Sequence, residues 1–251
     1  MNKKAIRKII DTYGQTFYEE IGIKLTDSPS ALFQWFYASN LFSARISSEI
    51  AVKAAQNFIA AGYTSSNKMA ESTWDQRVKI LNDANYTRYQ ERTSTFFGDL
   101  AGKLNERYQG DLRKLRDEAN RDPENIRKAL GQFKGEGNVG IDIFFREVQL
   151  IWNELYPFAD QKAIKAAGKL NLSQDPETLA KNLSKKNFVR LIAALVRIDL
   201  NHDYDLNKQI DQKDASGKKY SRQELYEKAR EQDISGRSKM SKQKLKEALK
   251  L

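Results

Sequence analysis

Apolar residues recur every three to four positions along most of the first 200 residues, which is the spacing of one face of an α-helix. The pattern is strongest on either side of a glycine-rich turn. Before the turn, Ile126, Ala129, Leu130 and Phe133 lie at helical spacing. After it, residues 141–155 are apolar around most of the helix circumference, so this second helix is expected at the centre of the fold. Because no stretch of the first 200 residues alternates convincingly with period two, the sequence predicts an all-α protein.

The same periodicity divides the rest of the chain. Further helices are predicted over residues 3–22, 29–40, 48–61, 67–84 (as a pair), 89–108, 111–119, 160–171, 175–183 and 187–200. Residues 201–219 are polar and poor in aliphatic side chains, which is typical of a linker. Residues 220–251 hold two short helical patterns. We therefore expect a helical domain over residues 1–200, a linker over 201–219 and a small module over 220–251.

Composition narrows the class of protein. The 40% hydrophobic content is enough for a core, and no apolar run approaches the roughly 20 residues of a membrane span. The basic N-terminus is followed by neither an apolar segment nor a cleavage site, so no secretory signal is expected. With no cysteine, the chain cannot form a disulfide, a thiolate-ligated zinc site or an iron–sulfur cluster. We expect a cytoplasmic protein without membrane contact.

The net charge of +10 favours a polyanionic partner, most often nucleic acid. Its distribution says more than its size. Residues 213–251 contain twelve Lys and Arg against six Asp and Glu, a net charge of +6. More than half of the excess charge therefore lies in the last 39 residues.

The glycine-rich turn is the most distinctive local feature. Gly135, Gly137 and Gly140 fall within six positions, a density that supplies positive φ and close backbone approach between two helices. The turn does not fit a nucleotide-binding loop, because the chain has no GxxxxGK(S/T) pattern and the turn follows a helix rather than a strand. A catalytic triad is also limited to His202, the one histidine, which lies in a polar connection.

The central stretch, residues 124–160 with a hairpin over about 124–152, resembles the helix-hairpin-helix and Gly/Pro-Asp signature of the endonuclease III-like (HhH-GPD) DNA glycosylase superfamily. The match runs from about residue 27 to residue 172. Residues 137–142 stand in place of its LPGVGxKTA hairpin, and residues 159–172 are similar to VDTHVxRVxxRLGL in length, start and end. Residues 41–45 resemble its LLSAQ segment, and Asn85-Tyr86 lie where it has a GLY turn. The resemblance implies a two-lobed helical glycosylase fold.

The resemblance also implies that the hairpin grips a DNA phosphate through backbone N–H groups, without reading sequence. The residues concerned are Lys134, Gly135, Gly137, Asn138, Val139 and Gly140. A monovalent cation at the hairpin is compatible with the resemblance, and no other cofactor is expected. The alternative is a tight interhelical turn that binds nothing.

By resemblance, Asp160 is the catalytic carboxylate, which stabilises positive charge on the sugar as the N-glycosidic bond breaks or helps to activate water. The alternative is that Asp160 only caps a helix after Pro157. Asp142 stands where strand-cleaving members carry their Schiff-base lysine, so lyase chemistry by that route is not expected. Arg45 is the candidate wedge that fills the gap left by an extruded base, with Asn85 and Tyr86 as the opposing loop. Alternatively, Arg45 is an ordinary surface arginine.

The C-terminal residues resemble a second family, the helix–extended loop–helix module at the N-terminus of the transcription terminator Rho, which is also appended to Ku-like proteins. The matching positions are Leu225, Ala229, 236–240, Lys242, Leu245 and 248–249. The resemblance implies that Arg237, Lys239, Lys242 and Lys244 contact phosphates. The alternative is a solvated basic tail.

Together these features predict a protein that binds double-stranded DNA as a monomer, associated with the nucleoid. The specific expectation is a monofunctional DNA glycosylase of the base-excision-repair type, which releases a damaged or modified base. Two alternatives remain open: a non-catalytic DNA-binding or architectural protein on the same scaffold, and a helical protein-interaction adaptor whose basic tail is incidental.

Overall fold

The computed structural model describes residues 3–204 and, beyond them, residues 225, 229, 240–241, 244–245 and 248–249. The described residues form helices and connections and contain no strand, which confirms the all-α prediction. The chain divides into two compact units, residues 1–202 and 203–251. Within the described part of the chain, none of the helices combines the length and apolar character that a membrane crossing requires.

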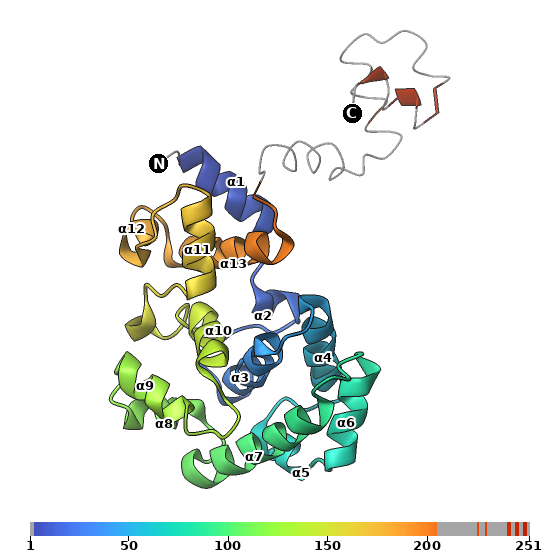
Figure 1. Ribbon diagram of the computed structural model, residues 1–251, viewed down its shortest axis with the longest axis vertical. Coiled ribbons are helices and arrows are strands. Elements are labelled where there is room, and N and C mark those ends of the chain that lie inside the picture. Colours follow the sequence, from blue (N-terminus) through green and yellow to red (C-terminus); the bar gives the residue numbers. More distant parts are fainter. Residues whose placement is uncertain are drawn as a thin grey trace. The chain divides into compact units, whose positions relative to one another are not determined.

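The first unit contains two groups of helices (Figure 1). One group is built on α13 (Lys185–Asn201), against which α1 (Lys3–Tyr13), α11 (Gln161–Lys169) and α12 (Pro176–Ala180) pack. The other group consists of α3 (Pro29–Ser43), α4 (Ser48–Ala60), α5 (Ser66–Glu71), α6 (Trp74–Asp83), α7 (Gln90–Tyr108), α8 (Leu112–Glu118) and α9 (Pro123–Leu130). The short helix α2 (Phe17–Glu20) follows α1.

Helix α10 (Asn138–Val148) lies between the two groups, because it packs against α3 on one side and α13 on the other. This confirms the central position predicted from its apolar circumference. Aromatic side chains make the contact with α3. The rings of Phe36 and Phe144 meet edge to face with their centroids 5.2 Å apart, and Trp35 Nε1 donates to the carbonyl of Phe144 at 3.1 Å. Each fully buried aromatic ring contributes roughly 1.5–3 kcal/mol to folding.

Several helix starts agree with their sequence signals. Ser28 caps α3 by accepting from the N–H of Ala31, with Pro29 at the first helical position. Thr73 and Gln76 form the predicted capping box of α6 through two reciprocal hydrogen bonds of 3.2 and 2.8 Å. These signals are local, so the sequence is sufficient to place them.

Two predicted helices are shorter than expected. Residues 3–22 do not form one helix, because α1 ends at Tyr13 and α2 begins at Phe17. Thr16, the N-cap of α2, donates its backbone N–H to the side chain of Glu19. The central helix ends at Val148 rather than just before Pro157. A turn and a short 3-10 helix, η1 (Asn153–Leu155), occupy the remaining residues.

In the second unit, the described residues include a small apolar cluster. Leu225, Ala229, Leu245 and Leu249 are buried together, and Met240 packs against them. Ser241 Oγ accepts from the backbone N–H of Lys244, as an N-terminal cap does. Lys244 is exposed, whereas Arg237, Lys239 and Lys242 lie outside the described residues.

Candidate functional site

Two adjoining pockets meet at the loop between α3 and α4. The first, which we call the hairpin pocket, has a volume of about 640 Å³ and lies between this loop, the start of α7 and residues 134–140. The second, the carboxylate pocket, has a volume of about 540 Å³ and lies between the same loop, α10, α11 and the end of α13. Residues 43–45 and Val139 line both pockets. The exposed side chain of Arg45 therefore belongs to the boundary between them.

The glycine turn forms one wall of the hairpin pocket. Gly135 has a φ of 102°, and a Cβ there would lie 2.8 Å from the Phe96 ring, so this position requires glycine. Gly137 is the N-cap of α10 and has no side chain to accept from the first N–H groups of the helix. Lys134, Gly137, Asn138 and Val139 are all exposed. The first turn of α10 is thus open to an incoming acceptor.

Glu136 is buried inside this turn, which the sequence analysis did not foresee. Its side chain is only 9% exposed; Oε2 accepts from Asn40 Nδ2 at 3.3 Å, and Oε1 has no partner among the described residues. A Cβ on Gly140 would lie 1.9 Å from Oε1. Gly140 therefore makes room for this carboxyl group. Burial raises the pKa of Glu136 to about 8, against a smaller lowering by Asn40.

Asp160 lines the carboxylate pocket and is the N-cap of α11. Its Oδ1 accepts from the N–H of Ala163 at 2.9 Å, and its Oδ2 accepts from Arg146 Nη1 at 2.8 Å. The residue is 7% exposed, and Arg146 is buried as well. The capping alternative is thus present in the structure, together with a buried ion pair that the sequence analysis missed.

Three residues near the end of α10 fix the surroundings of Asp160. Besides the ion pair made by Arg146, the buried carboxylate of Glu147 accepts from the N–H groups of Phe17 and Tyr18 at 2.8 and 2.9 Å. Burial raises the pKa of Glu147 to about 7, although Arg146 and these N–H groups lower it in part. The side-chain amide of Gln149 bonds both the N–H and the carbonyl of Phe158, each at 2.8 Å.

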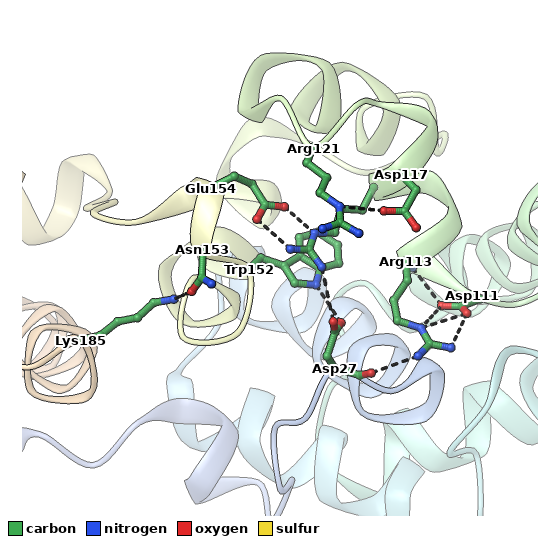
Figure 2. A network of polar contacts seen from close by, with 10 residues as sticks. Asp27, Asp111, Arg113, Asp117, Arg121, Trp152, Asn153, Glu154 and Lys185 are labelled. Carbon is green, nitrogen blue, oxygen red and sulfur yellow. Dashed lines mark hydrogen bonds and ion pairs between the residues drawn. The ribbon is translucent and has the colours of Figure 1, made fainter.

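The segment between Gln149 and Phe158 is also held from outside. Arg116 forms an ion pair with Glu154, and its Cζ lies 5.0 Å from the centroid of the Trp152 ring. Trp152 Nε1 in turn donates to Asp27 Oδ1 at 3.1 Å. Figure 2 shows this network, which continues to Lys185 of α13 through Asn153. The chain that leads from α10 to Asp160 is therefore fixed along its length by contacts with both groups of helices.

Three of the four aspartates that line the pockets are paired, namely Asp142, Asp160 and Asp199, whereas the exposed Asp99 of the hairpin pocket takes part in no ion pair among the described residues. Several cations at the pockets are unpaired as well. Asp142 pairs with Arg127 of α9 at 2.7 Å, and Asp160 pairs with Arg146. In the part of the chain that the structure describes, five exposed pocket cations have no ion-pair partner: Arg45, Arg92, Lys134, Lys162 and Lys165. The rims of the pockets are therefore positively charged.

The carboxylate pocket also has an apolar rim. Val139 is 61% exposed and Leu200 is 40% exposed, and both line this pocket. They are two of the three large hydrophobic residues that are exposed among the described residues. Exposed apolar side chains at a pocket mouth are a feature of binding sites for ligands with apolar surface.

The predicted opposing loop is only partly in place. Asn85 is exposed with a φ of 62°, but it lines neither pocket. Tyr86 is 1% exposed, and its hydroxyl accepts from Thr93 Oγ1 at 3.2 Å. Its ring is buried, although Tyr86 lines the hairpin pocket, so its role as a base-displacing side chain stays a prediction. Tyr89 is the half-exposed aromatic residue of this region that lines the hairpin pocket.

Arg45 thus lines the hairpin pocket together with the hairpin residues and lines the carboxylate pocket together with Asp160. Sequence reasoning missed Arg92, Glu136, Arg146 and Gln149. One signal was available, since an arginine and a glutamate inside an otherwise apolar helix need buried partners. No group of three or more His, Asp or Glu side chains in the described residues is arranged to hold a metal ion.

No protein-family model matches this chain, and comparisons with curated proteins and with solved structures return no significant match.

Proposed function

We propose that the protein binds duplex DNA and acts as a monofunctional, HhH-GPD-like DNA glycosylase that releases a damaged or modified base. The observation that carries this proposal is the position of Arg45 between two pockets. One pocket offers open backbone N–H groups and unpaired cations, and the other offers a buried carboxylate.

The hairpin pocket has the chemistry of a phosphate site. The first turn of α10 presents N–H groups at the positive end of an eleven-residue helix. Lys134, Arg92 and Arg45 line this pocket and outnumber its one exposed acid, Asp99, so they add a net positive charge around the helix start. Contacts of this kind hold a DNA backbone without reading its sequence, so affinity should fall steeply as salt rises.

The carboxylate pocket has the size and lining for an extruded nucleotide. Its volume of about 540 Å³ lies within the range of roughly 300–1,000 Å³ typical of small-ligand pockets. Val139 and Leu200 can cover the faces of a base, while Arg45 occupies the space that the base leaves in the stack. Asp160 then lies in the pocket that receives the sugar, where its charge can stabilise an oxocarbenium-like transition state.

Base release tests the proposal directly. Duplexes that each carry one damaged base are incubated with the protein, and abasic sites are revealed by hot alkali. We expect Asp160→Asn to lower the rate by about 10²–10³-fold, because Asn keeps the helix cap but removes the charge. Asp175→Asn is the matched control, because Asp175 caps α12 in the same way and lies at neither pocket. Equal rates for Asp160→Asn and wild type would contradict the enzyme proposal.

A second candidate function is favoured by one observation. Both carboxylate oxygens of Asp160 are already engaged, one of them by a buried arginine, as in a structural ion pair. A non-catalytic protein that binds DNA and accepts an extruded nucleotide fits this arrangement as well. Salt-sensitive duplex binding without release of any base supports that candidate, and absence of DNA binding supports an adaptor role instead.

A further inference from the structure

Arg146 connects the central helix α10 to Asp160. Its Nη1 donates to Asp160 Oδ2 at 2.8 Å, and its guanidinium lies 4.9 Å from the ring of Phe17. Arg146 Nε is buried and has no hydrogen-bond partner among the described residues. A buried cation held by one carboxylate restrains that carboxylate strongly, because separating the pair leaves both charges buried and unpaired.

We propose that Arg146 is a positioning residue, which fixes the carboxylate of Asp160 in the wall of the carboxylate pocket and links it to the helix that begins in the glycine turn. This inference rests on the proposed function, because it concerns the same pocket. It assigns Arg146 a role in addition to packing.

Arg146 of α10 and Gln149, the C-cap of that helix, divide this task between them. Gln149 fixes the backbone two residues before Asp160 through its bonds to Phe158. Arg146 fixes the side chain of Asp160 itself, so that Oδ1 remains on the N–H of Ala163. Backbone position and carboxylate orientation are therefore set by Gln149, the C-cap of α10, and by Arg146 within the helix.

The same helix also carries the candidate phosphate site. Arg146 lies eight residues after Asn138, the first residue of α10, which is a distance of about 12 Å along a helix. Because a single uninterrupted helix joins the two positions, a phosphate held at the first turn of α10 would locate Asp160 relative to the DNA backbone. Arg146 is the side chain through which this location reaches the carboxylate.

The first test does not depend on the proposed function. Hydrogen exchange of the Ala163 amide reports whether Asp160 keeps its capping position. We expect the exchange to be at least about tenfold faster in Arg146→Met and close to wild type in Arg146→Lys, which keeps a cation. Arg113→Met is the matched control, because it breaks another pair between an arginine and a helix-capping aspartate, Asp111 of α8, and both residues lie at neither pocket. If Arg146→Met does not fold, Arg146→Gln replaces it. An unchanged exchange rate would overturn the inference.

The second test measures how much more tightly the protein binds a positive charge than a neutral group at the position of the sugar, where the Asp160 carboxylate is proposed to act. Affinity is compared for duplexes that contain a cationic pyrrolidine abasic analogue or a neutral tetrahydrofuran abasic site. We expect wild type to prefer the cationic analogue and Arg146→Met to lose at least about tenfold of this preference. Arg146→Lys and the control Arg113→Met should retain most of it.

The outcomes separate the two proposals. A purely structural role for Arg146 predicts that Met, which keeps the volume, preserves the preference better than Lys, and that result would overturn the inference. A wild-type protein without any preference for the cationic analogue would contradict the glycosylase proposal. In that case the Ala163 exchange still decides whether Arg146 positions Asp160.

Discussion

Two buried carboxyl groups border the two pockets, and their surroundings are opposite. Asp160 faces a guanidinium and a helix N–H, so each of its oxygens has a partner. Glu136 faces a single amide, one of its oxygens has no partner in the described structure, and burial raises its pKa to about 8. At neutral pH burial therefore favours the protonated, uncharged form of Glu136. The carboxylate proposed to act on a sugar has a cation beside it, whereas the acid beside the proposed phosphate site has none.

The largest expected effect comes from removing the carboxylate that has a cation. Asp160→Ala leaves Arg146 buried without its ion-pair partner, and we expect the free energy of unfolding to fall by about 3–5 kcal/mol. Urea denaturation measures the change. Asp175→Ala, which removes an exposed helix cap, should cost only about 1 kcal/mol. A similar cost for both variants would show that the Arg146 pair adds nothing beyond capping.

The next effect concerns the carboxyl group without a cation. The folded protein keeps the Glu136 proton up to a pH of about 8, whereas the unfolded chain releases it near 4.5. Its contribution to stability is therefore complete below about pH 4.5 and is lost as pH rises through 8. We expect Glu136→Gln to be more stable than wild type at pH 9 by an amount on the order of a few kcal/mol, with the difference shrinking toward pH 5. A difference that is constant with pH would contradict the burial argument.

A smaller effect is expected from a deletion within the second unit, because this change leaves both Asp160 and Glu136 in place. Deleting residues 213–251 removes a net charge of +6. We expect duplex affinity to fall by about tenfold or more at moderate salt and the salt dependence to become shallower, since fewer counterions are released. Base release at high protein concentration should persist. Complete loss of base release would contradict a modular arrangement.

The smallest effect is expected from a single substitution in the hairpin pocket that changes duplex affinity without altering either buried carboxyl group. Lys134→Ala removes one unpaired cation beside the glycine turn, so duplex affinity should fall a few-fold for all sequences and the salt slope should decrease by about one. Fluorescence anisotropy at several salt concentrations measures both quantities. Lys79→Ala is a suitable control, because Lys79 and its ion-pair partner Asp83 both lie away from the two pockets. A control variant that weakens binding as much as Lys134→Ala would show that only total charge matters.

The sequence predicts the helices wherever the signal is local. Ser28 with Pro29, Thr73 with Gln76, and Asp160 each mark a helix start within three residues, and all three starts are present. The break between α1 and α2 was missed, because apolar spacing continues across Gly14 and hides it.

The site is less accessible to sequence reasoning. The Arg146–Asp160 pair joins residues that are 14 positions apart across an irregular segment, so periodicity gives no hint of it. Glu136 stands between two glycines, which is typical of an exposed turn, and its burial depends on contacts with α3 and on the space at Gly140. Tyr86 follows a polar turn, yet tertiary packing buries it.

The bonds between Gln149 and Phe158 close residues 150–157 into a loop of fixed length. Inside such a loop, exchanging one side chain for another changes local packing but not the distance between the two ends. Adding or deleting a single residue is different, because the amide of Gln149 can then no longer meet both backbone groups of Phe158, and the start of α11 moves with them. Variation among natural or engineered forms of this protein should therefore be tolerated here in composition far more readily than in length.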